Sequence, residues 1–467
     1  MSPIPPGYAP SSLGVLLLLY LLTLLTTASA AEVEFHGHYR ARGLIYDSLS
    51  LSEDNPNLLG RTSFVDHRLR LSPAIHASSR VGVFAQIDML PLTVWGDSTN
   101  TWTDPVTGDA IAMAYADGVA PYGDAADGTS YLRNIQLTRA YADVYTEYGR
   151  VRFGRMPIDW GAGVLFDDGN DPLDEYGDTG DRLQFTTRVG PVYVMGAYEL
   201  INEGLLDRDE LEDAMNAADL AVAWQTETLG VGLYNRLRFQ GSPQFRAYNG
   251  SVWAHVEMGP ANVDAEIVGV FGRGDLDTGV NDIQIMAAGG VIEGSIDIDK
   301  IYGGLQFGLA TGDTDPNDNV LRTFTFDRDY NIALMMFEEP MPVLAPAVIN
   351  DANGGRDLDA VRTGDGISNA LFLRPHIGYH LRPDLSADLA YIGARALQLP
   401  EDEQADRGYG QEFDLSLTYS PFEHFSATGT AGAFLPGPYY ENYEHETLGG
   451  DFDAPSFGGR LVLTAEF

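Results

Sequence analysis

The sequence predicts an all-β protein, a transmembrane antiparallel up-and-down β-barrel of about 18 strands, with 16 strands as the alternative. Three observations carry this prediction. Apolar and charged residues alternate in many segments, short and long connections alternate along the chain, and an export signal precedes the first such segment. The 52 Gly and 24 Tyr suit turns and pleated, half-buried strands.

The alternation is plainest in residues 33–45, where one parity is apolar and the other carries Glu34, Arg40 and Arg42. Residues 65–71 and 81–89 repeat the pattern. Successive side chains of a strand point to opposite faces, so each segment has one apolar and one charged face. In a membrane barrel the apolar face meets lipid and the charged face lines the lumen, whereas in a soluble sandwich the apolar face meets a core. One strand alone does not distinguish the two.

The connections favour the membrane barrel. Tight turns are expected at 76–80, 148–149, 189–191, 228–230, 258–260, 382–384 and 420–422. Longer polar connections are expected at 91–130, 159–180, 201–215, 240–247, 272–281, 311–368, 397–409 and 435–455. Membrane barrels have short periplasmic turns and long extracellular loops, and a soluble sandwich has no reason to segregate its connections in this way.

The first thirty residues have the features of a cleaved signal peptide. An apolar run over 13–25 precedes Ala28-Ser29-Ala30, an A-x-A cleavage site. A retained membrane anchor is the alternative, but the run is short for a spanning helix. We therefore expect cleavage before Ala31 and a single barrel domain over 31–467 in the bacterial outer membrane. The alternating last strand ends on Phe467, which resembles the signal read by the barrel-assembly machinery.

Two stretches resemble porins and alginate-export-type barrels. Val151 to Pro157 followed by Trp160-Gly161-Ala162-Gly163 is similar to the strand and W-G-x-G loop of those proteins, and Gly180-Asp181-Arg182 resembles their re-entry into the membrane. Residues 311–316 and 324–330 are similar to a long-loop pattern of the same group. The resemblance implies an outer-membrane channel, a porin or an export pore. It does not imply a particular solute.

Arginines concentrate in the strands, whereas carboxylates crowd the proposed loops. The arginines on the parity that faces the lumen are Arg40, Arg42, Arg68, Arg70, Arg133, Arg139, Arg152, Arg182, Arg188, Arg236, Arg238, Arg374 and Arg460. Rings of arginine favour anionic solutes, so one interpretation is a path for small hydrophilic anions or an anionic polysaccharide. The other is a brace in which these arginines pair with lumenal carboxylates such as Glu34, Asp66, Asp88, Asp143, Asp264, Glu266, Asp388, Glu412 and Asp414. Both can hold together.

The acidic loops suggest partners at the cell surface. Asp313, Asp315 and Asp318 are spaced somewhat like a calcium loop, but the glycine and the distal glutamate of the full pattern are missing. A solvated loop, or a layer of divalent ions bridging to lipopolysaccharide phosphates, is the favoured interpretation. No other cofactor is expected. The absence of cysteine excludes thiolate metal sites, and the net charge of -39 argues against nucleic acid as a partner.

We predict no enzymatic activity. The motifs G-x-S-x-G, H-E-x-x-H and G-x-x-x-x-G-K are absent, and the nine histidines are scattered. A barrel hydrolase and a non-conducting structural or adhesive barrel stay open as alternatives. Within the 311–368 connection, residues 324–337 are unusually apolar, so they are expected either to fold into the lumen as a constriction or to form a short helix that caps the mouth.

Overall fold

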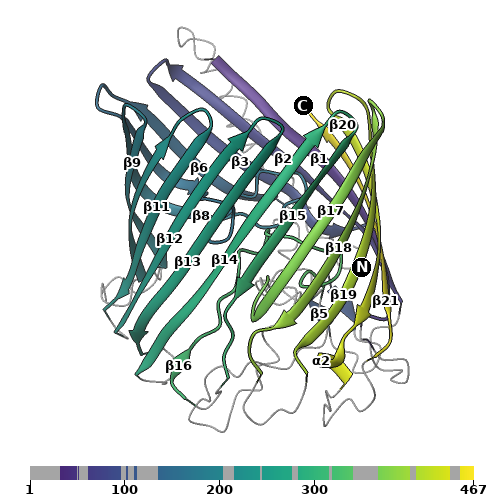
Figure 1. Ribbon diagram of the computed structural model, residues 1–467. Helices are drawn as coiled ribbons and strands as arrows, with labels where there is room; N and C mark the ends of the chain where they lie inside the picture. The colour runs from purple at the N-terminus through teal and green to yellow at the C-terminus, as the bar shows by residue number, and fades with distance from the viewer. Residues whose placement is uncertain are drawn as a thin grey trace, which may run out of the picture.

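The protein is a closed antiparallel β-barrel of 18 strands (Figure 1), as the sequence predicts. The computed structural model describes residues 32–49, 51, 61–95, 101–103, 110–112, 135–202, 215–241, 244–275, 282–314, 318–339, 366–399, 406–441 and 453–467. The expected signal peptide, Arg133, Asp315 and most of the 91–130 connection lie outside these residues.

The barrel strands follow one another in chain order. The first nine are β1 (Glu32–Asp47), β2 (Thr62–Ser78), β3 (Val81–Val94), β6 (Ile135–Tyr145), β7 (Arg150–Pro157), β8 (Thr179–Val189), β9 (Val192–Asn202), β10 (Met215–Gln225) and β11 (Leu229–Gln240). The other nine are β12 (Phe245–Met258), β13 (Ala261–Gly274), β14 (Ile283–Ile298), β15 (Ile301–Ala310), β17 (Ala370–Arg382), β18 (Leu385–Ala396), β19 (Gly408–Phe422), β20 (Phe425–Pro436) and β21 (Ser456–Glu466).

Four short elements lie outside the barrel wall. The strands β4 (Thr101–Thr103) and β5 (Ala110–Ala112) pair only with each other. The two-residue β16 (Val320–Leu321) runs parallel to the loop end of β14, and α2 (Pro438–Glu441) is a single helical turn after β20. No helix among the described residues is long and apolar enough to cross a bilayer.

The barrel is closed because β1 pairs on both sides. Tyr39 lies opposite Leu69 of β2 and opposite Ala465 of β21. Each barrel strand from β2 to β20 pairs with the barrel strands before and after it in the chain. Closure leaves no open sheet edge, which is the condition for a β-structure to cross a membrane.

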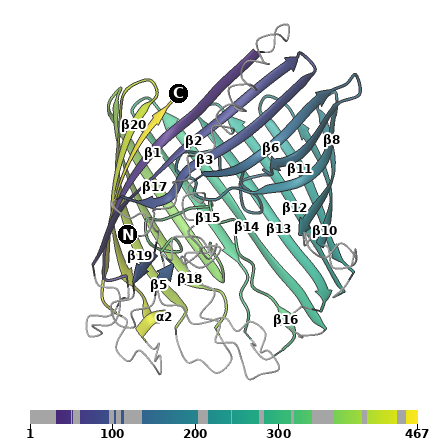
Figure 2. The same cartoon turned by 180° about the vertical axis from the view of Figure 1, so that it is seen from behind.

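The two ends of the barrel differ, as Figure 2 shows. Successive strands are joined by turns of two to four residues at one end and, with one exception, by longer connections at the other. The exception is the connection expected at 240–247, which has only residues 241–244 because β11 and β12 extend further than the sequence predicted. Two of the predicted turns lie elsewhere: the turn expected at 228–230 is at 226–228, and the one expected at 420–422 is at 423–424. In both cases strand pairing extends over residues that the sequence placed in the turn, because a Gly or Pro can end a hairpin strand as well as form its turn.

The outer face is apolar and the inner face is charged. Phe35 is 65% exposed, Ile267 65% and Leu233 53%, although all three lie within strands. By contrast, Arg40, which shares β1 with Phe35, is 1% exposed, and Glu266, which precedes Ile267 in β13, is fully buried. This is the reverse of a soluble protein and the arrangement of a membrane barrel.

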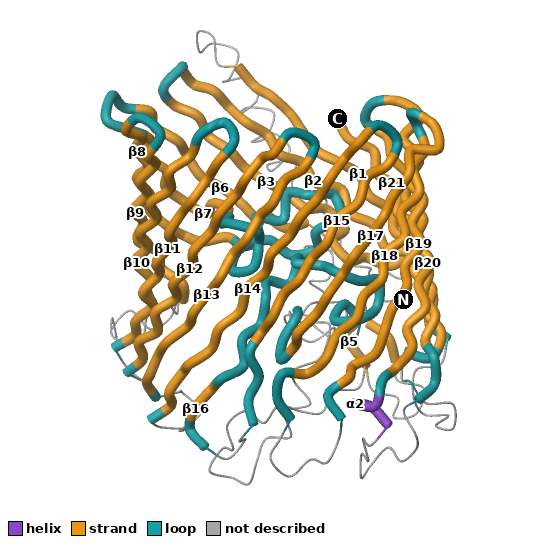
Figure 3. Tube along the Cα trace, in the orientation of Figure 1, coloured by secondary structure: helices purple, strands orange, loops and turns teal. Residues whose placement is uncertain are grey.

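Two long connections fold back into the barrel, where Figure 3 shows them crossing its interior. We call residues 158–178 the first inward loop and residues 318–339 the second inward loop. The apolar part of the second, residues 324–337, contains no helix and packs against inward-facing side chains of β14, β17, β18 and β20. Of the two arrangements that the sequence left open for this segment, the lumenal one is therefore observed.

Candidate functional site

The first inward loop crosses the lumen from one wall to the other. Near its start Trp160 Nε1 donates to Ser251 Oγ of β12 at 2.9 Å. Near its end the Glu175 carboxylate forms an ion pair with Arg42 of β1. The sequence predicts a surface loop at 159–180, whereas the structure places this loop inside the barrel.

A buried glutamate fixes the start of this loop. Glu266 of β13 accepts hydrogen bonds from Ala162 N at 2.9 Å, Val164 N at 3.2 Å and Ser251 Oγ at 2.7 Å. Gly161 has a φ of 70°, and a Cβ atom there would lie 2.5 Å from Glu266 Oε2. Only glycine adopts this left-handed conformation freely and lets the backbone come so close. The W-G-x-G motif is thus explained by its contact with Glu266.

Aromatic rings hold the same part of the loop against β11. The rings of Trp160 and Phe166 lie 5.3 Å and 5.6 Å from the ring of Tyr234, between centroids. The guanidinium of Arg236 lies 5.2 Å from the centroid of Phe166. Burial of three rings and a cation–π contact add to the hydrogen bonds at Glu266.

On the opposite wall the arginines predicted to line the lumen bind the loop backbone. Arg40 Nη1 donates to the carbonyls of Pro172 and Leu173 at 3.3 Å each, and Arg68 Nη2 donates to that of Pro172 at 3.3 Å. Two further arginines bind the preceding residues. Arg70 donates to Gly169 O, and Arg139 donates to Asp168 O and, at 2.6 Å, to Asn170 Oδ1.

The same arginines also form ion pairs with the barrel wall. Arg70 and Asp88 make a two-pronged pair, with both N–O distances 2.8 Å. Arg42 donates to Asp66 Oδ2 through Nε at 2.9 Å and Nη2 at 2.6 Å. Guanidinium and carboxylate groups match in this geometry, which fixes the side chains. We call Arg40, Arg42, Arg68, Arg70 and Arg139 the arginine cluster.

The remaining predicted lumen arginines are spread around the barrel. Arg182 and Arg236 surround Glu199 and Asp219, with N–O distances of 2.8–3.7 Å, and Arg238 lies beside them. Arg152 binds Asp143 at 2.6 and 2.7 Å. Arg374 donates to Gln306 at 3.1 Å. Arg188 is exposed beside a short turn, where it donates to Gly190 O, so it does not join the others.

The brace of arginines and carboxylates that the sequence suggested is only partly formed. Asp66, Asp88 and Asp143 pair with arginines, but Asp264 pairs with His255 at 2.7 Å and Asp388 with His376 at 2.9 Å. Glu266, Glu412 and Asp414 instead accept main-chain hydrogen bonds from the inward loops. Sequence could not assign this role because the loop donors come from positions far along the chain.

The second inward loop is held in the same manner as the first. Glu412 of β19, which is fully buried, accepts from Leu334 N at 3.1 Å, Met335 N at 2.8 Å and Met336 N at 2.7 Å. Asp414 accepts from Leu334 N at 2.9 Å. Three successive N–H groups turned toward one carboxylate form a small anion nest. In each loop a lumenal glutamate therefore anchors the main chain.

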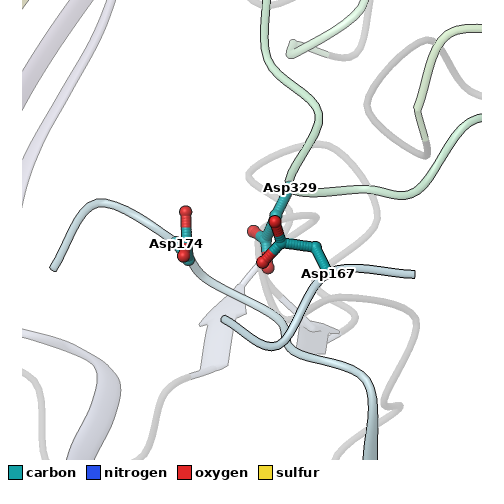
Figure 4. Close-up of side chains that lie close together, drawn as sticks. All are labelled: Asp167, Asp174 and Asp329. Atoms are coloured by element: carbon teal, nitrogen blue, oxygen red, sulfur yellow. The ribbon is translucent and has the colours of Figure 1, made fainter. Parts of the chain in front are cut away.

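The two inward loops meet at an acidic contact, drawn in Figure 4. Ligand atoms of Asp167, Asp174 and Asp329 all lie within 4.8 Å of one another. Asp329 accepts from Glu175 N at 2.8 Å and from Tyr176 N. Burial raises the pKa of Asp174 to about 7, with Asp329 contributing, and burial raises the pKa of Asp329 to about 6. Three such carboxylates could hold a cation or share protons.

A second carboxyl pair lies beside this contact. Asp178 of the first loop is hydrogen-bonded to Asp327 of the second. Burial raises the pKa of both groups, and the proximity of Asp178 raises that of Asp327 further. The main chain continues the contact, since Asp327 N donates to Val164 O at 3.0 Å. Protonated carboxyls can join the loops, whereas two carboxylates would repel.

The predicted calcium candidates have another neighbour. Asp313 Oδ1 and Asp318 Oδ2 accept from Arg322 at 3.2 and 2.8 Å, and Arg322 N donates to Asp313 at 3.0 Å. A guanidinium therefore lies between the two carboxylates. The bond from Arg322 lowers the pKa of Asp318. Calcium binding here stays a prediction.

Comparison with known proteins supports the fold. No family model matches the chain, and no curated protein matches it in sequence. Among solved structures, OccAB1 of Acinetobacter baumannii is 12% identical, with a TM-score of 0.54 over 94% of this chain and 99% of that one. OccK2 (OpdF) of Pseudomonas aeruginosa is 9% identical, with a TM-score of 0.52 over 93% and 98%.

OpdL of Pseudomonas aeruginosa is similar to the same extent, at 11% identity and a TM-score of 0.51 over 93% of this chain and 99% of that one. These neighbours are outer-membrane porins. At such low identity the likeness shows the fold, a porin-type barrel of 18 strands. The bacterial outer membrane, the location that the sequence predicts, is where porins of this fold lie.

Proposed function

We propose that the protein is an outer-membrane channel for small hydrophilic solutes and that it prefers anions. The observation that carries the proposal is the arginine cluster at the place where the first inward loop meets β1, β2 and β6. Five guanidinium groups lie there, whereas their ion pairs among the described residues involve only three carboxylates, Asp66, Asp88 and Glu175. Positive charge in a narrow lumen attracts anions and repels cations.

Unused donors support the same proposal. Among the described residues, the Nε atoms of Arg40, Arg68 and Arg139 are buried and have no hydrogen-bond partner. These Nε atoms are enclosed, so they support the proposal through the positive charge that no hydrogen-bond acceptor offsets, and such charge attracts carboxylates and phosphates. The raised pKa of Asp174 reduces the opposing negative charge near neutral pH.

The two inward loops would set the width of the path. Because both are anchored by buried glutamates, we propose that they restrict passage to small molecules. An export pore for an anionic polysaccharide remains the alternative from the sequence resemblance. The neighbours named above are porins, so that alternative has less support.

Liposome swelling tests the proposal. Purified protein is reconstituted into liposomes, which are then diluted into anionic, neutral or cationic solutes of matched size. We expect swelling with all three to exceed that of empty liposomes, fastest with the anion. Swelling equal to that of empty liposomes would support the non-conducting alternative, and fastest swelling with the cation would contradict the role of the arginine cluster.

A further inference from the structure

Two arginines lie side by side on the outer face of the barrel. Arg246 of β12 and Arg273 of β13 are directly opposite each other in the strand register, and both are exposed. The residues on either side of Arg246 in β12, Phe245 and Ala247, are buried, so Arg246 and its register partner Arg273 point away from the lumen. Both lie near the end of the barrel that carries the long connections (Figure 1): Arg246 follows the four-residue connection 241–244, and Arg273 precedes the longer connection 275–282.

This arrangement is unfavourable without an anion. Like charges directly opposite each other on a sheet face repel. Their neighbours in the same row of the outer face are Phe239 of β11 and Gln284 of β14, which carry no charge. No ion pair to either arginine is formed by a carboxylate of the described residues. Asp275, the first residue after β13, accepts from Asp282 N at 2.9 Å.

The row below the arginines, one step toward the middle of the barrel, is apolar. It consists of side chains that are 41–55% exposed on the same outer face: Leu237, Tyr248, Phe271 and Met286. The Tyr248 hydroxyl donates a hydrogen bond to Asn235 Oδ1 at 2.5 Å, so the ring of Tyr248 lies on the outer surface. A pair of cations above an apolar band matches an amphiphile with an anionic headgroup and acyl chains.

We propose that Arg246 and Arg273 bind the phosphate group of a phosphorylated lipid in the outer leaflet, with its acyl chains over Tyr248 and Phe271. The inference rests on the proposed outer-membrane location, where the long-loop ends of the strands face the lipopolysaccharide leaflet. Opposite Cβ atoms in a sheet lie about 4.5–5.5 Å apart, so both guanidinium groups can reach one phosphate. The proposed ligand is the lipid and not free phosphate, because the apolar row contributes to binding.

The chain offers a matched control. Arg395 of β18 is also exposed, on the outer face and near a long connection, but its register partners are Leu371 and Gly408. Substituting Arg395 removes one outward arginine without touching the pair. The double variant R246Q/R273Q keeps side chains of similar length, and these exposed positions are not part of the lumen.

Native mass spectrometry of the detergent-purified barrel measures the lipid directly. We expect the wild type and Arg395→Gln to hold one hexaacyl lipid A more tightly than the double variant, by about tenfold or more. Lipid A stripped of its phosphates should bind the wild type as weakly as lipid A binds the double variant. Inorganic phosphate at millimolar concentration should not displace the lipid.

Equal retention of lipid A by the wild type and the double variant would overturn the proposal, as would equal binding of the dephosphorylated lipid. Loss in Arg395→Gln as large as in the double variant would show general charge attraction and would also overturn it. Heat-dependent gel mobility verifies that each variant is folded. Conductance is measured in parallel. If the double variant both conducts and holds lipid A like the wild type, the lipid site is refuted and the channel is not. If the wild type holds lipid A but does not conduct, the channel is refuted and the lipid site is not.

Discussion

The anchoring role of Glu266 gives a sharp prediction for Glu266→Gln. Glutamine preserves the shape of the side chain and one acceptor oxygen but removes the negative charge. The carboxylate now receives three hydrogen bonds, two from the main chain of the first inward loop and one from Ser251. The substitution therefore weakens the anchor of the loop on β13 and leaves the contacts of the loop with the arginine cluster in place.

The size of the effect follows from these bonds. A hydrogen bond to a charged group contributes roughly 1.5–3 kcal/mol, and a neutral one about 1 kcal/mol. Replacing the two main-chain bonds to a carboxylate by bonds to an amide thus costs about 1–4 kcal/mol. Since 1.4 kcal/mol corresponds to a tenfold change, the population with the loop released rises roughly 5- to 700-fold.

Single-channel recording in planar bilayers measures this change. We expect Glu266→Gln to show frequent steps to a larger conductance level that the wild type seldom visits. Glu257→Gln is the control, because Glu257 lies at the short-turn end of the neighbouring β12 and is exposed. A folded Glu266→Gln protein with the conductance and noise of the wild type would refute the anchoring role.

Two further predictions concern the contact between the loops and the second loop. Burial and the neighbouring Asp329 raise the pKa of Asp174 to about 7, above its unfolded value of about 3.9. The stabilisation by protonated Asp174 is complete below the unfolded value and is lost as pH rises to about 7, so channel noise should grow between about pH 4 and 7 and level off above that, and Asp174→Asn should flatten this dependence. A Cβ atom on Gly289 would lie 2.2 Å from Phe324 Cδ1, so Gly289→Ala should destabilise the second loop by about 1–3 kcal/mol in urea unfolding, whereas Gly429→Ala, with nothing within 4 Å, should not.

The barrel itself could be predicted from the sequence because its signal is local. Strand alternation depends on neighbouring residues, so the parity that carries Arg40 and Arg42 could be assigned to the lumen without knowledge of their partners. The same rule places Arg155 on the outer face, where it pairs with the exposed Asp181 at 2.5 Å. Hairpin turns are local as well, and they were misplaced only by a few residues.

The interior of the barrel could not be predicted because its contacts are distant in sequence. Ala162 and Glu266 are 104 residues apart, and Leu334 and Glu412 are 78 apart. No alternation or spacing links such positions. The one local trace was the pair of glycines around Ala162, whose positive φ angles turn the backbone toward Glu266. The W-G-x-G motif resembles a loop of porins, but its physical cause, the contact with Glu266, exists only in the folded barrel.

The reversal potential across a planar bilayer tests the proposed function most directly. Under a tenfold gradient of KCl at neutral pH, a lumen governed by the arginine cluster should give a potential whose sign shows that Cl⁻ carries more current than K⁺. Simultaneous replacement of Arg40 and Arg68 by glutamine should move that potential toward zero. A wild-type potential of the opposite sign would contradict the proposal, because it would mean that the acidic residues, and not the arginines, determine which ions pass.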